Sequence, residues 1–587
     1  MSKRHGVKGT SQISRQAEPP ITLTRRELLA SAAIASAAVI AACAPAQTTT
    51  RKTTGSFTLS RPATITGDAT IPAAMSQAAA KLQPPHTLAG GLLAPTGGAP
   101  DLLLTFGTLP ASYVGATVGT SPATLLTHMR VPIDTVTADD AKKLLSGALT
   151  DWSQAGAPYS LPVRLMSLGG LALPAGLSLA PTASAAGDPF SLSTEMNAQK
   201  GSLVVLPVEH ATWQLRNLGV DGIYPAQGRG DLAKATLPPF TLTLGVSKAL
   251  STQGLDPKAL VSTFAALLWA GGAVVDMVSV GDIMLGRGVN NQMLAHDYTF
   301  PYQGMRDDLQ AADVRVANLE CTITDLVAPP SDPTTFTFIS AKKAVEGLTY
   351  AGFNLITVAN NHSAGPGKAA MLDMLATLRA KNITVTGAGP SLAEATKPAI
   401  VTAKGVRFAM LGYHDGKTVP FQGQMAKAND WGLAPVNLDT LPQDLTAARQ
   451  QADVVIPYFH WGIEYTKTPM KLQQQIARAA IDAGADLVLG NHPHWTQGIE
   501  FYKNKLIIYS MGNFIFDQDW SRPTKESIIF HLYWRGASLS SVRLVPTIDV
   551  SRCQPTIMTQ ADAVDVFQRM WSGSDILASG VYGPEAG

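Results

Sequence analysis

The chain has 587 residues, a net charge of +2 and charged side chains at only 15% of its positions. This length is too great for one ordinary hydrophobic core, so we expect at least two domains. Beyond the N-terminal segment there is no basic block or stripe, which argues against a nucleic-acid partner. The three cysteines argue against a metal site built from thiolates.

The N-terminal segment has the features of an export signal. Arg25 and Arg26 precede an uncharged run of small apolar residues, 30–42, and this order resembles a twin-arginine signal. Residues 39–43 resemble a bacterial lipobox, with Cys43 as the lipidated residue. The run is too short to span a membrane, and a structural helix is the alternative. We predict a signal peptide over 1–43, a Thr-rich tether over 44–58, and a protein lipid-anchored to the outer face of the cytoplasmic membrane.

The next region, 59–271, is rich in Gly, Pro and Ala. Residues 131–157 and 201–267 faintly resemble type II periplasmic solute-binding domains of the phosphate-binding kind. The resemblance is carried by a helix pattern over 137–147, by Leu149-Thr150-Asp151-Trp152, and by 201–206 and 220–223. Because a Ser/Thr/Gly anion-binding loop is not evident, we expect a degenerate scaffold or docking domain, with its boundary near 270–274.

Strand and helix patterns alternate in the next domain, 274–548. Apolar runs predict buried strands over 274–282, 314–316, 353–358, 408–412, 454–459 and 485–489. Apolar residues at three- and four-residue spacing predict helices over 341–351, 367–381 and 471–484. This order indicates βαβ-type layering in an α/β fold. We expect Pro546 to close the last strand of this domain. In the extension, 549–587, we expect one amphipathic helix over 561–570.

Most of these strands end in residues that can bind a metal ion. Ligands collect at the carboxyl ends of strands in open α/β folds, so residues far apart in sequence can share one site. Carboxylate, amide and imidazole donors suit hard to borderline divalent cations, and two cations could clamp an in-line displacement. A lone strand-end His is more often structural, and Asn360 to His362 could form a turn. The residues concerned are Asp282, Asn318, Glu320, Asn360, Asn361, His362, His460, His492 and His494.

At these positions the chain resembles the CapA family of bacterial capsule and poly-γ-glutamate synthesis proteins, which have a calcineurin-like metallophosphatase fold. The matching stretches are GDIMLGR (281–287), ANLE (317–320), ANNH (359–362), HWGIEY (460–465), GNHPH (490–494) and YSMGNFIFDQ (509–518). The resemblance implies a layered α/β metallophosphatase-like sandwich, preceded here by the α/β solute-binding-like domain.

The resemblance also implies roles for individual residues. His362 would be the general acid, and one or two Mn, Fe or Zn ions would be the cofactor. The chain departs from the metallophosphatase pattern at Met284, where that pattern has a His ligand, and at Glu320, which replaces a bridging Asp. Catalytic competence is therefore open. The implied metal shell is Asp282, Glu320, Asn361, His460, His492 and His494.

Several other residues near these motifs are candidates for a role at the site. Arg287 could hold a phosphate or carboxylate through its guanidinium fork, or could be a surface arginine. We expect three residues to orient the metal ligands through hydrogen bonds: Asn318, Glu464 and Asn513. Glu464 could equally be a solvated acid. His414 is left outside the metal shell. Cys321 and Cys553 lack a spacing that would establish a disulfide.

The preferred function is metal-dependent hydrolysis or transfer in the synthesis of a capsule or poly-γ-glutamate-type polymer. The expected partners are an anionic surface polymer or its precursor, capsule-synthesis proteins, and the membrane through the lipid anchor. The alternative is a non-catalytic polymer-binding or export component. A weaker one is a solute-sensing lipoprotein led by the N-terminal domain.

Overall fold

The structure is a computed structural model. It describes residues 64–67, 87–90, 102–106, 109–168, 171–186, 189–252, 256–258, 261, 273–332, 334–420 and 423–584. Cys43, the predicted signal peptide and the predicted tether lie outside these residues. The described residues belong to one compact unit, Phe57–Gly587. No helix among them combines the length and apolar character needed to cross a bilayer.

The N-terminal region contains two sheets, ordered β2-β1-β3-β11-β4 and β6-β10-β5-β9-β7-β8. Their strands are β1 (Thr64–Gly67), β2 (Thr87–Gly90), β3 (Leu102–Thr105), β4 (Tyr113–Ser121), β5 (Ala123–Thr127), β6 (Thr135–Val136), β7 (Arg164–Leu168), β8 (Ser184–Ala186), β9 (Ser202–Pro207), β10 (Arg216–Val220) and β11 (Phe240–Ser247). The helices are α3 (Ala138–Ser146), α4 (Pro189–Ala198) and α5 (Lys248–Ser251), with 3-10 turns η2 (Trp152–Ala155), η3 (Val208–His210), η4 (Pro225–Gln227) and η5 (Leu232–Lys234).

Helix α3 confirms the helix predicted over 137–147. The side chain of Thr137 accepts a hydrogen bond from the Asp140 amide, which caps the helix start. Gly147 ends the helix in the left-handed conformation. The following Trp152 is fully buried, and its indole donates to Gly201 O at 2.9 Å. The segment that carried the faint resemblance is therefore ordered around a buried tryptophan.

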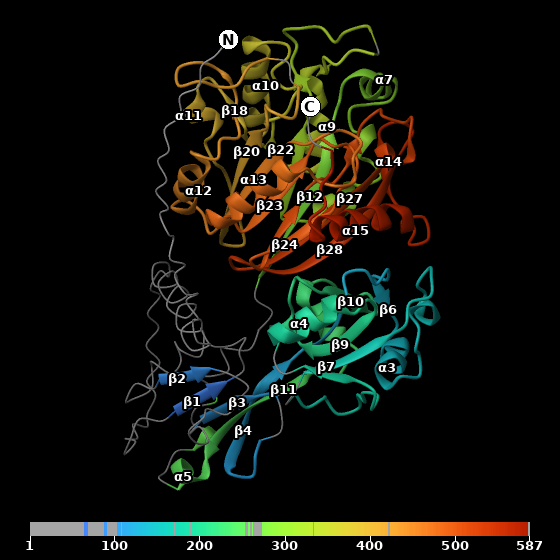
Figure 1. Ribbon diagram of the computed structural model, residues 1–587, viewed down its shortest axis with the longest axis vertical. Helices are drawn as coiled ribbons and strands as arrows, with labels where there is room; N and C mark the ends of the chain where they lie inside the picture. The colour runs from blue at the N-terminus through green and yellow to red at the C-terminus, as the bar shows by residue number, and fades with distance from the viewer. Residues whose placement is uncertain are drawn as a thin grey trace, which may run out of the picture. The chain divides into compact units, whose positions relative to one another are not determined.

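The C-terminal region contains two larger sheets, which can be followed in Figure 1 by β12 and β27 and by β20, β22 and β23. The first has the order β17-β16-β13-β12-β27-β28-β29, with β26 also paired to β12; the second has the order β19-β20-β22-β23-β25-β24. Their strands are β12 (Val274–Ile283), β13 (Val314–Leu319), β16 (Leu355–Thr357), β17 (Thr384–Thr386), β19 (Ala399–Ala403), β20 (Val406–His414), β22 (Val454–His460), β23 (Leu487–Asn491), β24 (Ile499–Tyr502), β25 (Lys505–Ile508), β26 (Asn513–Ile515), β27 (Glu526–Arg535), β28 (Ser538–Val550) and β29 (Gln554–Ile557).

Helices and short strand pairs complete this region. The helices are α7 (Arg287–Ala295), α8 (Arg306–Ala311), α9 (Val345–Ala351), α10 (Lys368–Ala380), α11 (Leu392–Ala395), α12 (Leu441–Arg449), α13 (Lys471–Asp482), α14 (Arg522–Lys525) and α15 (Val564–Ala578), with 3-10 turns η6 (Phe300–Tyr302) and η7 (Lys342–Ala344). The short pairs are β14 (Thr322–Ile323) with β15 (Ile339–Ser340), and β18 (Ala388–Gly389) with β21 (Gly432–Leu433).

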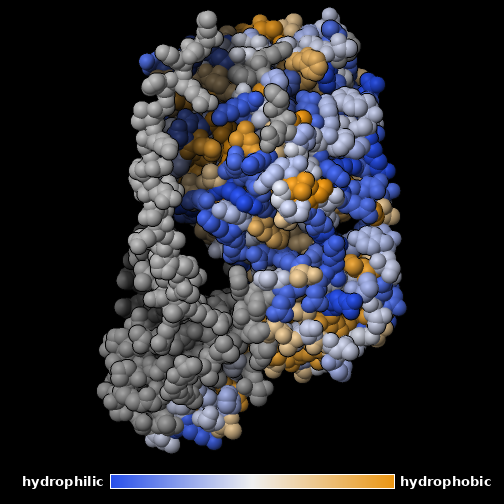
Figure 2. Space-filling view, in the orientation of Figure 1, coloured by the Kyte–Doolittle hydropathy of each residue, from blue (hydrophilic) through white to orange (hydrophobic). Residues whose placement is uncertain are grey.

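Alternating side chains place the sheets between apolar layers. On β12, Val275 and Met277 point into a cluster shared with the second sheet, whereas Val278 and Val280 point into one shared with α7 to α10. Buried residues of α12 and α13 cover the other face of the second sheet. The result is a helix-sheet-sheet-helix sandwich, so the predicted α/β class and βαβ layering are confirmed. On the face seen in Figure 2, hydrophobic residues are interspersed with hydrophilic ones.

The predicted strands and helices of this region are all present, with ends shifted by a few residues. The expectation that Pro546 closes the last strand was wrong, because β28 continues through Pro546 to Val550 and pairs with β29. Proline lacks an amide donor, but its carbonyl still accepts a hydrogen bond, here from the Met558 amide at 2.9 Å. The predicted C-terminal helix exists as α15 and extends to Ala578.

Candidate metal centre

The carboxylate of Asp282 lies at the end of β12 and is fully buried. The preceding Gly281 is required there, because a Cβ atom at this position would lie 2.0 Å from the carbonyl oxygen of Gly512. Asp282 Oδ1 accepts hydrogen bonds from the side-chain amides of Asn318 and Asn491, each at 2.7 Å. Amide donors from neighbouring strands therefore fix the orientation of this carboxylate.

Glu320 follows β13 and is also fully buried, yet neither of its carboxylate oxygens has a hydrogen-bond partner among the described residues. The nearest basic atoms are Nε2 of His362 and Nε2 of His460, each 3.7 Å from Glu320 Oε1. Burial, with Asp282 close by, raises the pKa of Glu320 well above its ordinary value. A charged carboxylate buried without donors is costly, and either a proton or a cation can offset that cost.

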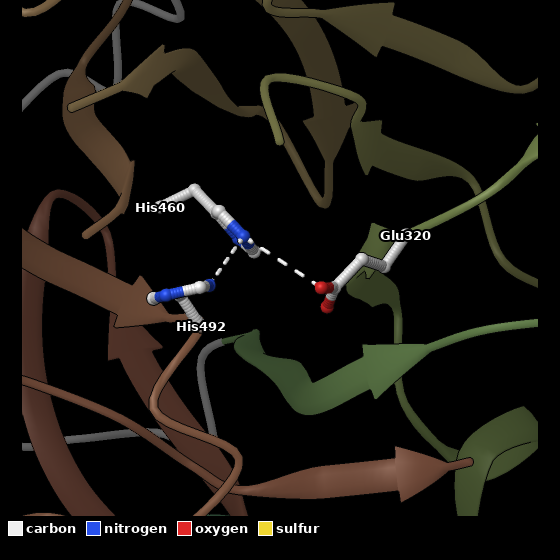
Figure 3. A group of neighbouring side chains, drawn as sticks. All are labelled: Glu320, His460 and His492. Carbon is white, nitrogen blue, oxygen red and sulfur yellow. Dashed lines mark hydrogen bonds and ion pairs between the residues drawn. The ribbon is translucent and has the colours of Figure 1, made fainter. Parts of the chain in front are cut away.

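Two imidazoles converge on Glu320, as Figure 3 shows. His460 ends β22, and its Nε2 atom lies 3.1 Å from His492 Nδ1 and 2.8 Å from Asn361 Oδ1. Burial, helped by neighbouring imidazoles, lowers the pKa of His460 and of His492 well below the ordinary value, so both rings are neutral. Neutral imidazole nitrogens and an amide oxygen facing a carboxylate form a donor set suited to a divalent cation.

A second donor group shares Glu320. The ligand atoms of Glu320, His460 and His492 lie within 4.8 Å of one another, and so do those of Asp282, Glu320 and His494. Asn513 Oδ1 lies 2.8 Å from His494 Nδ1, and the same nitrogen lies 3.8 Å from Asp282 Oδ2, so Asn513 holds the ring beside Asp282. The structure thus brings together all six residues of the predicted metal shell, with Glu320 common to both groups.

His362 lies beside the donor groups with one ring nitrogen held. Its Nδ1 donates to Phe336 O at 2.7 Å, and its ring stacks on Phe338 with the centroids 4.0 Å apart. Burial lowers the pKa of His362 to about 3, so the imidazole is neutral and Nε2 carries the lone pair that faces Glu320. In this state the ring accepts rather than donates a proton at Nε2.

Arg287 lies at the edge of the site and is mostly buried. Its guanidinium forms an ion pair with Asp517 and lies 4.5 Å from the centre of the Phe338 ring. Asp517 also accepts a hydrogen bond from the Gly288 amide at 2.9 Å, so the carboxylate that pairs with Arg287 is itself held in place. The buried Nε of Arg287 has no hydrogen-bond partner among the described residues. Arg287 Nη1 donates to Thr335 O at 3.4 Å, so the guanidinium is held in place at the edge of the site.

Several residues of the site have strained backbone conformations. Non-glycine residues at the site with left-handed φ angles are Arg287 (45°), Tyr465 (60°), His492 (102°) and His494 (57°). Such conformations are costly for residues with a side chain, and they persist at functional sites where surrounding contacts enforce them.

Met284 does not join the donor groups. Its side chain is fully buried in the apolar cluster beneath α7 to α10, and its Sδ accepts the Gly286 amide at 3.0 Å. Glu464 lies closer to the donor groups than Met284 does, with its Oε1 atom 3.9 Å from His494 Nε2. His414 stacks beside His460, with the ring centroids 5.9 Å apart, but belongs to neither donor group. Cys321 and Cys553 are both buried free thiols.

Sequence reasoning missed several residues of the site. Asn491 supports Asp282 directly and accepts the Met511 amide at 3.0 Å. Asn360, which the sequence did single out, donates to Asn318 Oδ1 at 3.0 Å and so supports the amide that holds Asp282. Tyr465 and Asp517 also contact site residues. The position of Asn491 in the sequence could have identified it, since it lies between Gly490 and His492 in the GNHPH motif.

Comparisons with known proteins agree with this arrangement. A family model described as bacterial capsule synthesis protein PGA_cap matches residues 276–518. The PGA biosynthesis protein CapA of Bacillus subtilis (strain 168) is 32% identical over 303 residues, 49% of this chain and 78% of that protein. The capsule biosynthesis protein CapA of Bacillus anthracis is 29% identical over 291 residues, 49% of this chain and 70% of that protein.

Among solved structures, an ABC-type phosphate transport receptor from Vibrio cholerae is 15% identical, covers 35% of this chain and 98% of that chain, and has a TM-score of 0.26. The function of the N-terminal region stays a prediction.

The fold and the site define a layered α/β protein with a candidate divalent-metal centre at the carboxyl ends of its strands. The similarity to the CapA proteins covers most of their length as well as the segments that carry the donor residues. The chain belongs to the bacterial capsule synthesis protein family, as the sequence motifs predicted.

Proposed function

We propose that this protein is an exported lipoprotein that carries out metal-dependent hydrolysis or transfer during the synthesis of a capsule or poly-γ-glutamate-type polymer. The observation that carries the proposal is the carboxylate of Glu320, which is buried without donors between two groups of ligand atoms. Membership of the capsule synthesis family supports a role in the synthesis of such a polymer. The features of residues 1–43 support export and lipid anchoring at Cys43.

Two groups of residues would each hold one metal ion. Asp282, Glu320 and His494 would hold one cation; Glu320, His460 and His492, with Asn361 Oδ1, would hold another. When bound, the metal supplies Lewis acidity and a nucleophile at neutral pH. The side-chain amides of Asn318 and Asn491 keep the carboxylate of Asp282 in place, and Asn513 keeps the His494 ring in place.

His362 and Arg287 would act on the substrate. Phe336 O fixes the Nδ1 proton of His362, so Nε2 would have to take up a proton before it could act as the general acid that protonates a leaving oxygen. Arg287, anchored by Asp517, would hold an anionic oxygen of a phosphate or carboxylate group through its guanidinium. His362 Nε2 lies 3.7 Å from Glu320 Oε1, so this ring faces the donor groups.

The first test is the metal content of the full chain purified in detergent, measured by elemental analysis. We expect about one or two equivalents of Mn, Fe or Zn in the wild type. His492→Ala and Asp282→Ala should lose metal, whereas His531→Gln, which alters a buried histidine outside the donor groups, should keep it. A wild type that stays metal-free after reloading would overturn the hydrolase proposal.

The second candidate is a non-catalytic polymer-binding or export component that uses the same site. The observation that favours it is Met284, which packs into the core where a metallophosphatase has a ligand. Hydrolysis of bis-p-nitrophenyl phosphate separates the two candidates. Turnover that depends on added metal and on His362 supports the hydrolase; metal binding without turnover supports the binding component.

A further inference from the structure

Two exposed aromatic side chains, Tyr465 and Trp520, adjoin the donor groups, and we refer to them as the aromatic corner. The Tyr465 ring stacks on the His494 ring with centroids 5.9 Å apart and planes inclined by 29°. The Trp520 ring meets Tyr465 at 77°, again with centroids 5.9 Å apart. Tyr465 is 36% exposed and Trp520 is 60% exposed. The corner therefore leads from a candidate ligand to the protein surface.

The backbone and a hydrogen bond hold the aromatic corner in this place. Tyr465 has a φ angle of 60°, and its amide donates to Pro493 O at 2.8 Å, between the two histidines of the GNHPH motif. Gln518 Nε2 donates to the Tyr465 hydroxyl at 3.3 Å, and Gln518 in turn accepts from Asn513 Nδ2 at 3.1 Å. The same asparagine orients His494, so one set of contacts positions the metal ligand and the exposed tyrosine together.

The chemistry of the corner favours an uncharged partner. Two rings at nearly right angles offer flat apolar faces, and large aromatic surfaces gain most from contact with another flat apolar surface. The charges that adjoin it are acidic or paired: Glu464 lies beside His494, and Asp519 forms an ion pair with Arg552 at 3.0 Å. A carboxylate beside these rings would repel an anionic group, but not a neutral ring.

Building on the function proposed above, we propose that Tyr465 and Trp520 determine specificity by binding an uncharged, flat-faced ring of the substrate. The ring, aromatic or pyranose, would lie next to the phosphoryl group held at the donor groups. The substrate class is then a phosphate ester that carries such a ring on the side of His494, rather than a bare polyanion.

The test compares phenylphosphonate with methylphosphonate, measured by calorimetry on the full chain loaded with Mn²⁺. Their C–P bonds are not hydrolysed by phosphoesterases, so binding is measured without turnover. We expect phenylphosphonate to bind about tenfold more tightly in the wild type. Trp520→Ala should bring this ratio close to one while leaving methylphosphonate binding unchanged, and Trp520→Phe should retain part of the preference.

Phe501→Ala is the matched control, because Phe501 is a partly exposed ring (38%) that meets Trp213 edge to face outside the donor groups. It should leave the ratio unchanged. Equal affinities in the wild type, or a preference that Trp520→Ala leaves intact, would overturn the inference even if the protein hydrolyses esters. A preference that depends on Trp520 in a protein without turnover would uphold the inference and refute the hydrolase proposal.

Discussion

Glu320→Gln should separate the stability of the fold from the stability that metal adds. Glu320 is buried, has no hydrogen-bond donors and belongs to both donor groups. Burial raises the pKa of this carboxyl, so the metal-free protein bears the cost of burying its charge or of neutralising it, and glutamine avoids both costs. We therefore expect the metal-free variant to unfold at the same temperature as the metal-free wild type, or above it.

The metal-bound state should respond in the opposite direction. A cation present at 100 times its dissociation constant stabilises the native state by about 2.7 kcal/mol. With an unfolding entropy of ~2.1 cal/mol/K per residue over a domain of roughly 275 residues, this raises Tm by about 5 °C. Glu320→Gln should lose nearly all of this increment, because the substitution takes a charged ligand from both groups at once.

Differential scanning calorimetry with and without Mn²⁺ measures both quantities. Glu526→Gln is the matched control, because Glu526 is equally buried but is paired with Arg522 and Arg569. This control should lower the Tm of the metal-free protein and keep the metal increment. If Glu320→Gln destabilised the metal-free protein as much as Glu526→Gln does, the carboxylate would have donors after all and the reasoning would be refuted.

Three further outcomes are expected. Burial alone would lower the pKa of His531, but Asp276 and Asp308 raise it above the ordinary value. The stability that the protonated ring adds to the fold is therefore complete below about pH 6.5 and is lost as pH rises through the folded pKa. Urea unfolding from pH 5 to 9 should show this loss in the wild type but not in His531→Gln. Arg287→Ala should weaken methylphosphonate binding about tenfold by calorimetry at unchanged metal content. Met284→His should destabilise the fold by about 1–3 kcal/mol without raising the metal stoichiometry in elemental analysis.

Much of the site could be predicted from the sequence because it depends on strand ends. Buried parallel strands read as continuous apolar runs, and their carboxyl ends converge, so Asp282 and His460 could be brought together without knowledge of any loop. β12 and β13 are paired so that Asp282 lies opposite Asn318, as such convergence requires. The residues that follow a strand directly were therefore the safest predictions.

Side-chain direction within loops was not predictable in the same way. Met284 lies two residues beyond Asp282, but the bond from the Gly286 amide to its sulfur turns it into the core. Asn491 became a support for Asp282 only because β23 and β12 end side by side across two sheets. Pro546 continues a strand because its carbonyl still finds a donor in the turn after β29. Each outcome depends on a tertiary contact that local pattern does not carry.

The two donor groups are unequal, and this inequality connects the two candidate functions. Glu320, His460 and His492 have the Asn361 oxygen beside them, whereas the group with Asp282 and His494 gains nothing from Met284. Fewer protein donors leave a cation more weakly held, so the first group should fill at a lower metal concentration. A clamp on both the attacking and the leaving oxygen needs both cations. Metal occupancy would then decide whether the same site binds an anionic group or cleaves it.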